Sequence, residues 1–238
     1  ACDELPELDC VLGIETRGWR YEQQAIVAHL EVEQPHRETA WQRFLPSGPL
    51  ALLPLADGRV SLVWSADDAQ AQRLQALDDV AFRAAVSDAS EQVLGKVIGN
   101  TRRAGFPLQL MHAERYIGMR CALVGDAAHA VHPLAGQGVN LGLLDAATFA
   151  DIILTAHARG RDIGDAGVLR RYERARKADN LTMIYALDGF KRLFSNDDAA
   201  LAMLRNCGMR AVDGFTPLKS VFMRRAMGLS GELPSLAR

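Results

Sequence analysis

The sequence lacks the long hydrophobic run that is typical of a membrane protein. No stretch of 18 apolar residues occurs among its 238 residues, so we expect no membrane-spanning helix. The first ten residues are acidic, which argues against a signal peptide in this stretch. Only four cysteines are present, and their scattered positions do not have the spacing of a metal site. We therefore expect a reduced, cytoplasmic protein.

The sequence also lacks features that would indicate other classes of protein. There is no G-x-S-x-G turn to carry a hydrolase nucleophile, and no internal repeat or low-complexity tract. What is present is a composition of 49% apolar and 24% charged residues, which predicts a globular protein of one or two domains. Residues 1–158 contain 12 Lys and Arg against 20 Asp and Glu, whereas residues 159–238 contain 15 against 9. The basic part either contacts an anionic partner or surface or simply solvates helix faces.

The first half of the sequence predicts a mainly antiparallel sheet of roughly three to five strands. Asp57-Gly58 is a turn signal between two apolar runs, so these runs predict a hairpin. The expected strands begin near Tyr21 and continue with Trp41–Leu45, Leu50–Leu55 and Arg59–Ser65, and residues 93–110 return to extended structure.

Helices dominate the second half of the prediction. Asp67-Asp68 can cap a first helix, and a long helix that ends near Ala158 is apolar almost all round, so we expect it to be buried. Its Asp145 is then a buried carboxylate, which needs partners. The predicted helices cover residues 67–77, 78–87, 139–158, 168–195 and two stretches that start at 197 and 217.

The most informative part of the chain is one stretch, Cys121-Ala-Leu-Val-Gly-Asp-Ala-Ala-His-Ala-Val-His-Pro-Leu-Ala-Gly-Gln-Gly-Val-Asn140. It predicts a buried strand over residues 121–124, then a loop, then a helix from about Val139. Gly136 and Gly138 permit a tight turn with backbone exposed to a ligand, and the free N–H groups of a helix N-terminus suit an anion or an electron-rich oxygen. On spacing alone, an ordinary strand-to-helix connection is the alternative.

The same stretch resembles a known motif. Gly125-Asp-Ala-Ala-His129, Pro133, Gly136-Gln-Gly-Val-Asn140 and Asp145-Ala146 are similar, in register, to the second flavin-binding motif of the FAD-dependent aromatic hydroxylases, the class A flavoprotein monooxygenases. Within that class the sequence looks most like the ubiquinone-biosynthesis hydroxylases, over about residues 12–229. The resemblance implies an α+β or α/β chain with a partial FAD-hydroxylase fold. Its parts would be an antiparallel substrate-binding sheet domain (11–115), a flavin-contact strand-loop-helix (116–158) and a helical C-terminal region (159–238).

The resemblance also implies roles for individual residues. Asp126 would hydrogen-bond a ribityl hydroxyl of FAD, and Pro133 would lie against the isoalloxazine ring near the place where oxygen reacts. Gly138, Val139 and Asn140 would present backbone N–H groups to the N1/O2 edge of the ring.

Gly136 and Gln137 complete the predicted FAD-contact segment, although the role of the Gln137 side chain is open. No side chain of this chain is expected to act as a catalytic nucleophile. His129 and His132 resemble a metal pair only superficially, and a local hydrogen bond is the expectation for His129.

The implied reaction is aromatic hydroxylation. NAD(P)H would reduce FAD, O2 would supply the added oxygen atom, and the protein would orient the rings and exclude water. The sequence departs from the family because its 238 residues contain neither the G-x-G-x-x-G turn that holds the FAD pyrophosphate nor the family's middle Asp-Gly motif. We therefore expect the C-terminal part of a longer hydroxylase, which alone binds FAD weakly or not at all and is inactive.

The implied substrate is a prenylated phenol or quinol. The sheet would cover the substrate side of the flavin ring, where Leu50, Leu52, Leu53 and Trp64 either line an apolar pocket or form ordinary core. The basic C-terminal region would dock a cytoplasmic protein peripherally on the inner face of the membrane, or it would pack or make oligomer contacts.

Other partners and functions stay open at this point. The partner would be a ubiquinone-synthesis complex or a second copy of the chain, and no nucleic acid is expected. A hydroxylase of a soluble small aromatic and a non-enzymatic assembly partner are the two alternative functions.

Overall fold

The computed structural model describes residues 13–131 and 137–194, together with positions 203, 208, 212–217, 219–220, 223 and 234–237. The chain divides into two compact units. The sheet unit comprises residues 20–108 and 194–198, and the helix unit comprises residues 1–19, 109–193 and 199–238. The division by role, with boundaries after residues 115 and 158, stays a prediction.

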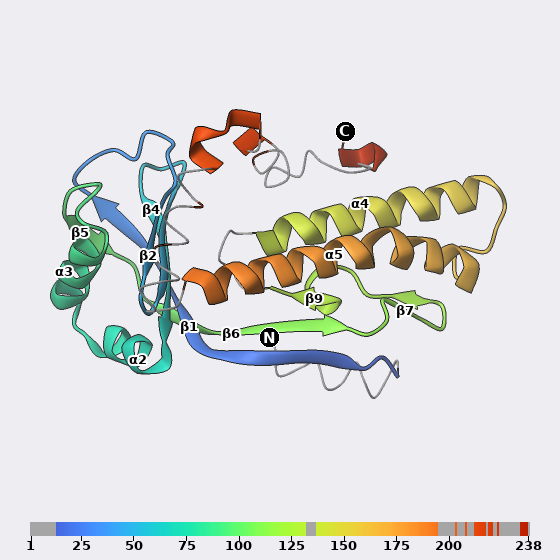
Figure 1. Cartoon of the computed structure of the whole chain (residues 1–238), viewed down its shortest axis with the longest axis horizontal. Helices are drawn as coiled ribbons and strands as arrows, with labels where there is room; N and C mark the ends of the chain where they lie inside the picture. The colour runs from blue at the N-terminus through green and yellow to red at the C-terminus, as the bar shows by residue number, and fades with distance from the viewer. Residues whose placement is uncertain are drawn as a thin grey trace. The chain divides into compact units, whose positions relative to one another are not determined.

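The sheet unit is built on antiparallel strands, as the alternation of apolar residues predicts (Figure 1). The strands are β1 (Thr16–Val32), β2 (Trp41–Leu45), β3 (Gly48–Pro54), β4 (Val60–Asp67), β5 (Val97–Asn100) and β6 (Ala104–Ala113). Their order is β2-β3-β4-β1-β6, with β5 also paired to β1, and both β1 and β6 contribute residues to the two units. The hairpin predicted at Asp57-Gly58 is confirmed, because β3 pairs with β4 and Gly58 has a φ of +86°.

Two helices of the sheet unit begin after aspartate caps. α2 (Asp68–Ala76) is capped by Asp67, whose carboxylate accepts the Gln70 N–H at 2.8 Å, so the predicted cap is confirmed. α3 (Asp79–Ala89) follows Asp78, whose carboxylate accepts the Ala81 N–H at 2.7 Å. Both helices lie on the same side of the strands (Figure 1), and their apolar residues join the core there.

One face of β3 and β4 forms that core, because successive residues of a strand point to opposite faces. Leu50 is the register partner of Trp64, and Leu52 is two residues further along the same face; all three are buried among residues of α2 and α3. Leu53 lies on the opposite face and is 40% exposed. Of the two alternatives that the sequence left open, ordinary core therefore holds for Leu50, Leu52 and Trp64, although Leu50 and Leu52 also line a pocket beside Trp41.

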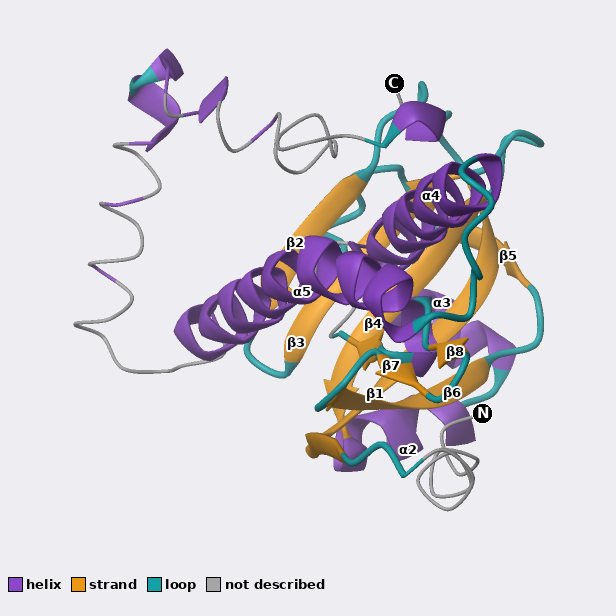
Figure 2. Cartoon of the chain, turned by 90° about the vertical axis from the view of Figure 1, so that its right-hand side faces the viewer, coloured by secondary structure: helices purple, strands orange, loops and turns teal. Residues whose placement is uncertain are grey.

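The helix unit contains two long helices and several short elements. These are β7 (Ile117–Gly118), β8 (Cys121–Ala122), η1 (Gly125–Ala127), β9 (His129–Ala130), α4 (Gln137–Ala158), α5 (Ala166–Phe194) and η3 (Ser235–Ala237). α4 and α5 run side by side in opposite directions (Figures 1 and 2), and β9 pairs with β6. The helices predicted to end near 158 and 195 are confirmed. Those predicted from 197 and 217 lie mostly outside the described residues.

The expected buried strand over residues 121–124 is shorter than predicted. Only Cys121 and Ala122 form β8, because its hairpin partner β7 has just two residues. The Leu123 N–H then bonds to the Tyr116 carbonyl, and Gly125, with a φ of +62°, turns the chain into η1.

α4 is not buried all round, which corrects a second prediction. Val139, Leu143 and Leu154 are 72%, 64% and 60% exposed, because the described elements pack against only part of the helix surface. Residues Gly138–Ala158 have the length and apolar composition of a membrane-crossing helix, although the core helix of a soluble protein passes the same test.

Candidate flavin-contact site

Asp126 lies in a short loop that approaches α4 closely. The preceding residue, Gly125, has a φ of +62°, a left-handed conformation that favours glycine. A Cβ added to Gly125 would lie 3.5 Å from the Cα of Gly142, so the backbones of η1 and α4 are neighbours. The Asp126 side chain is exposed and its carboxylate is available to accept a hydrogen bond from a ligand hydroxyl.

The first turn of α4, Gln137 to Asn140, is the second part of the site. Its backbone N–H groups are among the first four of the helix, which have no intrahelical acceptor. Val139 and Asn140 are exposed, and the one contact that a Cβ added to Gly138 would make with the described residues is with the Val131 side chain, at 3.6 Å. The turn is therefore accessible to a ligand.

The other predicted contacts cannot be placed on this surface. Pro133 and Gly136 lie outside the described residues, as does His132. Gln137 is described only as the first residue of α4.

The described residues fit a flavin. The ribityl chain carries hydroxyl donors, which the carboxylate of Asp126 can accept, and the N1/O2 edge of the ring is electron-rich and suits the N–H groups and positive end of α4. Gly142, which neighbours the loop, lies only about 6 Å along the helix axis from Gly138. Acceptor and donors thus belong to one region of the helix unit.

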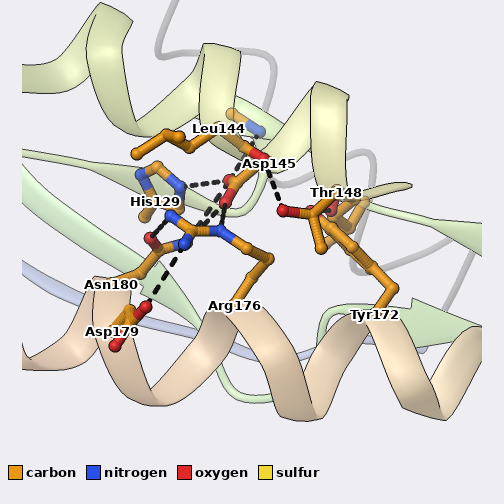
Figure 3. Close-up of polar contacts among 10 residues, drawn as sticks. His129, Leu144, Asp145, Thr148, Tyr172, Arg176, Asp179 and Asn180 are labelled. Carbon is orange, nitrogen blue, oxygen red and sulfur yellow. Dashed lines mark hydrogen bonds and ion pairs between the residues drawn. The ribbon is translucent and has the colours of Figure 1, made fainter. Parts of the chain in front are cut away.

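Asp145 of α4 is completely buried and connects this loop to α5 (Figure 3). Its Oδ2 accepts the Gly125 N–H at 3.2 Å and lies 2.6 Å from Nε2 of His129. Its Oδ1 accepts hydrogen bonds from Nε of Arg176 at 2.8 Å and from Nδ2 of Asn180 at 3.0 Å. The prediction that a buried Asp145 requires partners is confirmed.

Arg176 and its neighbours complete the network. The Arg176 side chain is buried, and its Nη2 donates to Oδ1 of Asn180 at 2.9 Å. Its Nη1 lies 3.4 Å from Oδ2 of Asp179. The hydroxyl of Tyr172, also buried, donates to the Leu123 carbonyl at 2.9 Å, so α5 is bonded to the chain just before Gly125 as well. The buried negative and positive charges are paired, as charges inside a protein must be.

The network determines the ionisation of its members. Burial alone would raise the pKa of Asp145, but hydrogen bonds from His129, Arg176 and Asn180 outweigh burial and hold that pKa below 3.8. Because an ionised carboxylate only accepts hydrogen bonds, the proton between His129 and Asp145 lies on Nε2 of the imidazole. Burial raises the pKa of Tyr116 to about 12, and burial together with the charge of Asp145 raises the pKa of Tyr172 as well, so both phenols are neutral.

Sequence reasoning did not find Arg176 and Asn180. The available signal is their spacing of four residues on the face of α5 that also carries the buried Tyr172 and Ile184. The local bond expected for His129 is wrong, because its partner Asp145 lies 16 residues further on, in α4. Within the described residues, no group of three or more His, Cys, Asp or Glu side chains gathers to hold a metal ion.

Comparison with known families identifies the class of protein. Residues 12–184 match the FAD binding domain family, a range that includes Asp126, the first turn of α4 and the Asp145 network. The chain belongs to this family, and the resemblance inferred from Gly125 to Ala146 is confirmed.

Particular relatives are more informative than the family. The chain is 44% identical over 230 residues to the ubiquinone hydroxylase UbiL of Rhodospirillum rubrum, covering 95% of this chain and 53% of the relative. It is 39% identical over 246 residues to the mitochondrial ubiquinone biosynthesis monooxygenase COQ6 of Homo sapiens, covering 89% of this chain and 53% of the relative. The chain thus spans about half the length of the curated relatives it matches.

Solved structures confirm the mixed helix and antiparallel-sheet fold as part of an FAD-hydroxylase fold. p-Nitrophenol 4-monooxygenase PnpA from Pseudomonas putida superposes with a TM-score of 0.72 at 16% identity, over 92% of this chain and 55% of that one. The Diels-Alderase PyrE3 superposes with a TM-score of 0.71 at 22% identity, over 95% of this chain and 49% of that one. Since one neighbour is named as a Diels-Alderase, the fold alone does not determine the chemistry.

Proposed function

We propose that this chain contributes to an FAD-dependent monooxygenase that hydroxylates the aromatic ring of a prenylated phenol in ubiquinone biosynthesis, with NAD(P)H and O2 as co-substrates. The observation that carries the proposal is the 44% identity to the ubiquinone hydroxylase UbiL over 95% of the chain. Identity at this level extends over both units, so it supports a shared substrate class where the fold alone would not.

The flavin contacts of the proposal come from the helix unit. Asp126 accepts a hydrogen bond from a ribityl hydroxyl, and the N–H groups of Gly138, Val139 and Asn140 face the N1/O2 edge of the ring. Pro133 and Gly136 lie outside the described residues, and the family resemblance implies that Pro133 would contact the ring. When bound, FAD supplies the redox chemistry, and these residues bind it and orient it.

The substrate contacts of the proposal come from the sheet unit. The face of β2, β3 and β4 opposite to α2 and α3 carries Phe44, Ala51, Leu53 and Val63, all apolar and all at least partly exposed. An apolar surface of this kind suits a prenyl chain better than it suits a soluble, polar aromatic compound. This face therefore favours the ubiquinone precursor over the alternative of a small soluble phenol.

A flavin spectrum of the purified chain, together with its intact mass, is the first test. Because its 238 residues contain no G-x-G-x-x-G turn, we expect weak FAD binding, measurable by titration and not by copurification. Asp126→Ala should weaken binding further, whereas Asp88→Ala, an exposed carboxylate in α3, should not. Equal FAD affinity of both variants would contradict the role of Asp126. If the chain is folded and FAD titration detects no binding, these residues need a further FAD-binding unit to hold the flavin.

Turnover tests the substrate class. Purified chain with FAD, NAD(P)H and O2 is offered a prenylated phenol and the same phenol without its prenyl chain, and gain of one oxygen atom is followed by mass spectrometry. The proposal expects oxygenation only of the prenylated compound, and only if the FAD titration shows binding. Oxygenation of the short phenol alone would favour the soluble-substrate alternative.

We also infer peripheral contact of a cytoplasmic protein with the inner face of the membrane. Support comes from the positive balance of residues 159–238 and from Arg170, Arg171 and Arg174, which are exposed on α5. Flotation with vesicles should show binding that requires anionic lipid and weakens with salt. Binding that is indifferent to lipid charge would contradict this inference.

A further inference from the structure

We propose that Asp145, oriented by Arg176 and Asn180, is a positioning residue that fixes the segment Gly125–His129 and thereby the Asp126 carboxylate. The proposal rests on the proposed flavin contact of Asp126. It assigns a role to a buried carboxylate that does not itself reach the flavin-contact surface.

The carboxylate of Asp145 bonds to the loop and to α5 at the same time. Oδ2 bonds to the loop, through the N–H of Gly125 at 3.2 Å and Nε2 of His129 at 2.6 Å. Oδ1 bonds to α5, through Nε of Arg176 at 2.8 Å and Nδ2 of Asn180 at 3.0 Å. Nδ2 of Asn180 also lies 3.3 Å from Oδ2, so Asn180 contacts both oxygens. The bonds to α5 fix the plane of the carboxylate, and the carboxylate then fixes the loop (Figure 3).

The two loop contacts bracket Asp126. Gly125, the residue before it, begins η1, and His129, three residues after it, is the first residue of β9, so the chain on both sides of Asp126 is tied to the same oxygen. Nδ1 of His129 has no partner among the described residues, so the bond to Asp145 is the one that orients the imidazole. The exposed carboxylate of Asp126 therefore projects from a turn that is held at both ends.

Stability alone does not explain a buried ion pair. Replacing such a pair with well-packed apolar residues is often neutral or stabilising, because both charges must be taken out of water. An apolar side chain at position 145 would not accept the Gly125 N–H or the His129 bond. Fixing the direction of the loop is what the carboxylate does and a leucine would not do.

Asp145→Asn tests the proposal directly. An amide cannot accept on both sides, so if its oxygen faces the loop then its NH2 group faces the donors Arg176 and Asn180. The matched control is Ile184→Val, which trims a completely buried side chain one turn beyond Asn180 and leaves every bond of the network intact. Both variants are compared in the full 238-residue chain, under conditions where circular dichroism shows them folded.

Amide hydrogen exchange is the first measurement, and it does not require flavin. In Asp145→Asn we expect the exchange of residues 125–129 to rise at least about tenfold relative to the rest of the helix unit, the change given by loss of one hydrogen bond to a charged group. In Ile184→Val any increase should be uniform across the unit. A uniform increase in both variants would overturn the proposal. If Asp145→Asn does not fold, Asn180→Ala takes its place, because it removes one donor to Oδ1 and keeps the charge pair.

FAD titration is the second measurement, and it separates this proposal from the proposed function. Asp126→Ala and Asp145→Asn should both weaken FAD binding by about tenfold or more, and Ile184→Val by less than about threefold. A loss in Asp126→Ala without a loss in Asp145→Asn would overturn the positioning role and leave the flavin contact standing. No change in Asp126→Ala would refute the flavin contact itself, and hydrogen exchange would then decide the positioning role alone.

Discussion

The two units of this protein bury their centres with different chemistry. The sheet unit packs side chains such as Leu62, Trp64 and Phe82 into an apolar cluster, and its buried serines carry no charge. The helix unit also has an apolar cluster, but between α4 and α5 it buries Asp145 and Arg176 with polar partners. The core of the sheet unit is stabilised by removing apolar side chains from water. The buried charges of the helix unit are stable only if each donor has an acceptor.

Apolar and polar cores differ in how strongly they fix the direction of neighbouring groups. Apolar packing has little directionality, so it tolerates swaps that conserve volume and it does not respond to pH. A buried polar network is directional, which allows it to orient a loop, but it is costly when one member is lost. The unit that carries the predicted flavin contacts is the one with the directional centre.

Removal of Asp145 should destabilise the helix unit most. Asp145→Ala leaves Arg176 buried without its carboxylate, so we expect the free energy of unfolding of the helix unit to fall by about 3–5 kcal/mol. Denaturant unfolding followed by far-ultraviolet circular dichroism, which α4 and α5 dominate, measures the loss. Asp151→Ala is the control in the same helix, since the Asp151 carboxylate accepts hydrogen bonds from Ser235 at an exposed site. Equal losses of unfolding free energy in Asp145→Ala and Asp151→Ala would mean that the buried network stabilises the helix unit no more than an exposed hydrogen bond does.

The matching change in the sheet unit is Leu62→Ala. Leu62 is completely buried in the core, so its truncation should cost about 2–5 kcal/mol. Fluorescence of Trp41 and Trp64 follows unfolding of this unit when both proteins also carry Trp19→Phe, because Trp19 belongs to the helix unit. The neighbouring Val63 faces the other side of the sheet and is only half-buried, so Val63→Ala should cost less. A larger cost at Val63 would mean that the core lies on the opposite face.

Acid should destabilise the helix unit, because the pKa of Asp145 is lowered in the folded chain. A carboxyl with a folded pKa below its unfolded value of 3.8 contributes stability that is present above that pH and is lost as pH falls towards the folded pKa. We therefore expect the helix unit to lose stability below about pH 4. Asp145→Asn should show a flatter profile in the same acid titration, monitored by circular dichroism. Identical profiles for both proteins would contradict the assignment.

The smallest effect concerns a helix cap of the sheet unit. Asp78→Ala removes the acceptor of the Ala81 N–H at the start of α3 and should cost about 1 kcal/mol. Asp78→Asn keeps an acceptor and should be near neutral. Thermal unfolding of the three proteins measures the difference, and an Asn variant as unstable as the Ala variant would point to charge rather than capping.

Local signals account for the parts of the fold that the sequence predicts well. Asp57-Gly58 and Asp67 act on their immediate neighbours, and both the hairpin and the cap are where these residues predict them. The faces of the sheet were open to the same reasoning, since adjacent residues such as Leu52 and Leu53 cannot share one face of a strand. The exposure of α4 was not predictable, because apolar composition does not reveal what covers a helix.

The residues of the site also differ in how well the sequence predicts them. Asp126 and the turn from Gly138 to Asn140 lie in a short turn and at a helix start, as the motif predicts. The partners of Asp145 come from α5, η1 and β9, and tertiary contacts of this kind leave only weak traces in a single sequence. Arg176 and Asn180 could be recognised as polar residues on a buried helix face, but not as ligands of one particular carboxylate.

The uncovered side of α4 has a practical consequence for handling the protein. Leu143 and Leu154 are three helical turns apart on one face, and both project into solvent. A formal net charge of −2 gives little electrostatic repulsion between molecules. Sulfate and similar salts strengthen apolar association, so colloidal behaviour should worsen in them, and dilute buffers away from the isoelectric point of about 6.3 are where the chain should stay dispersed.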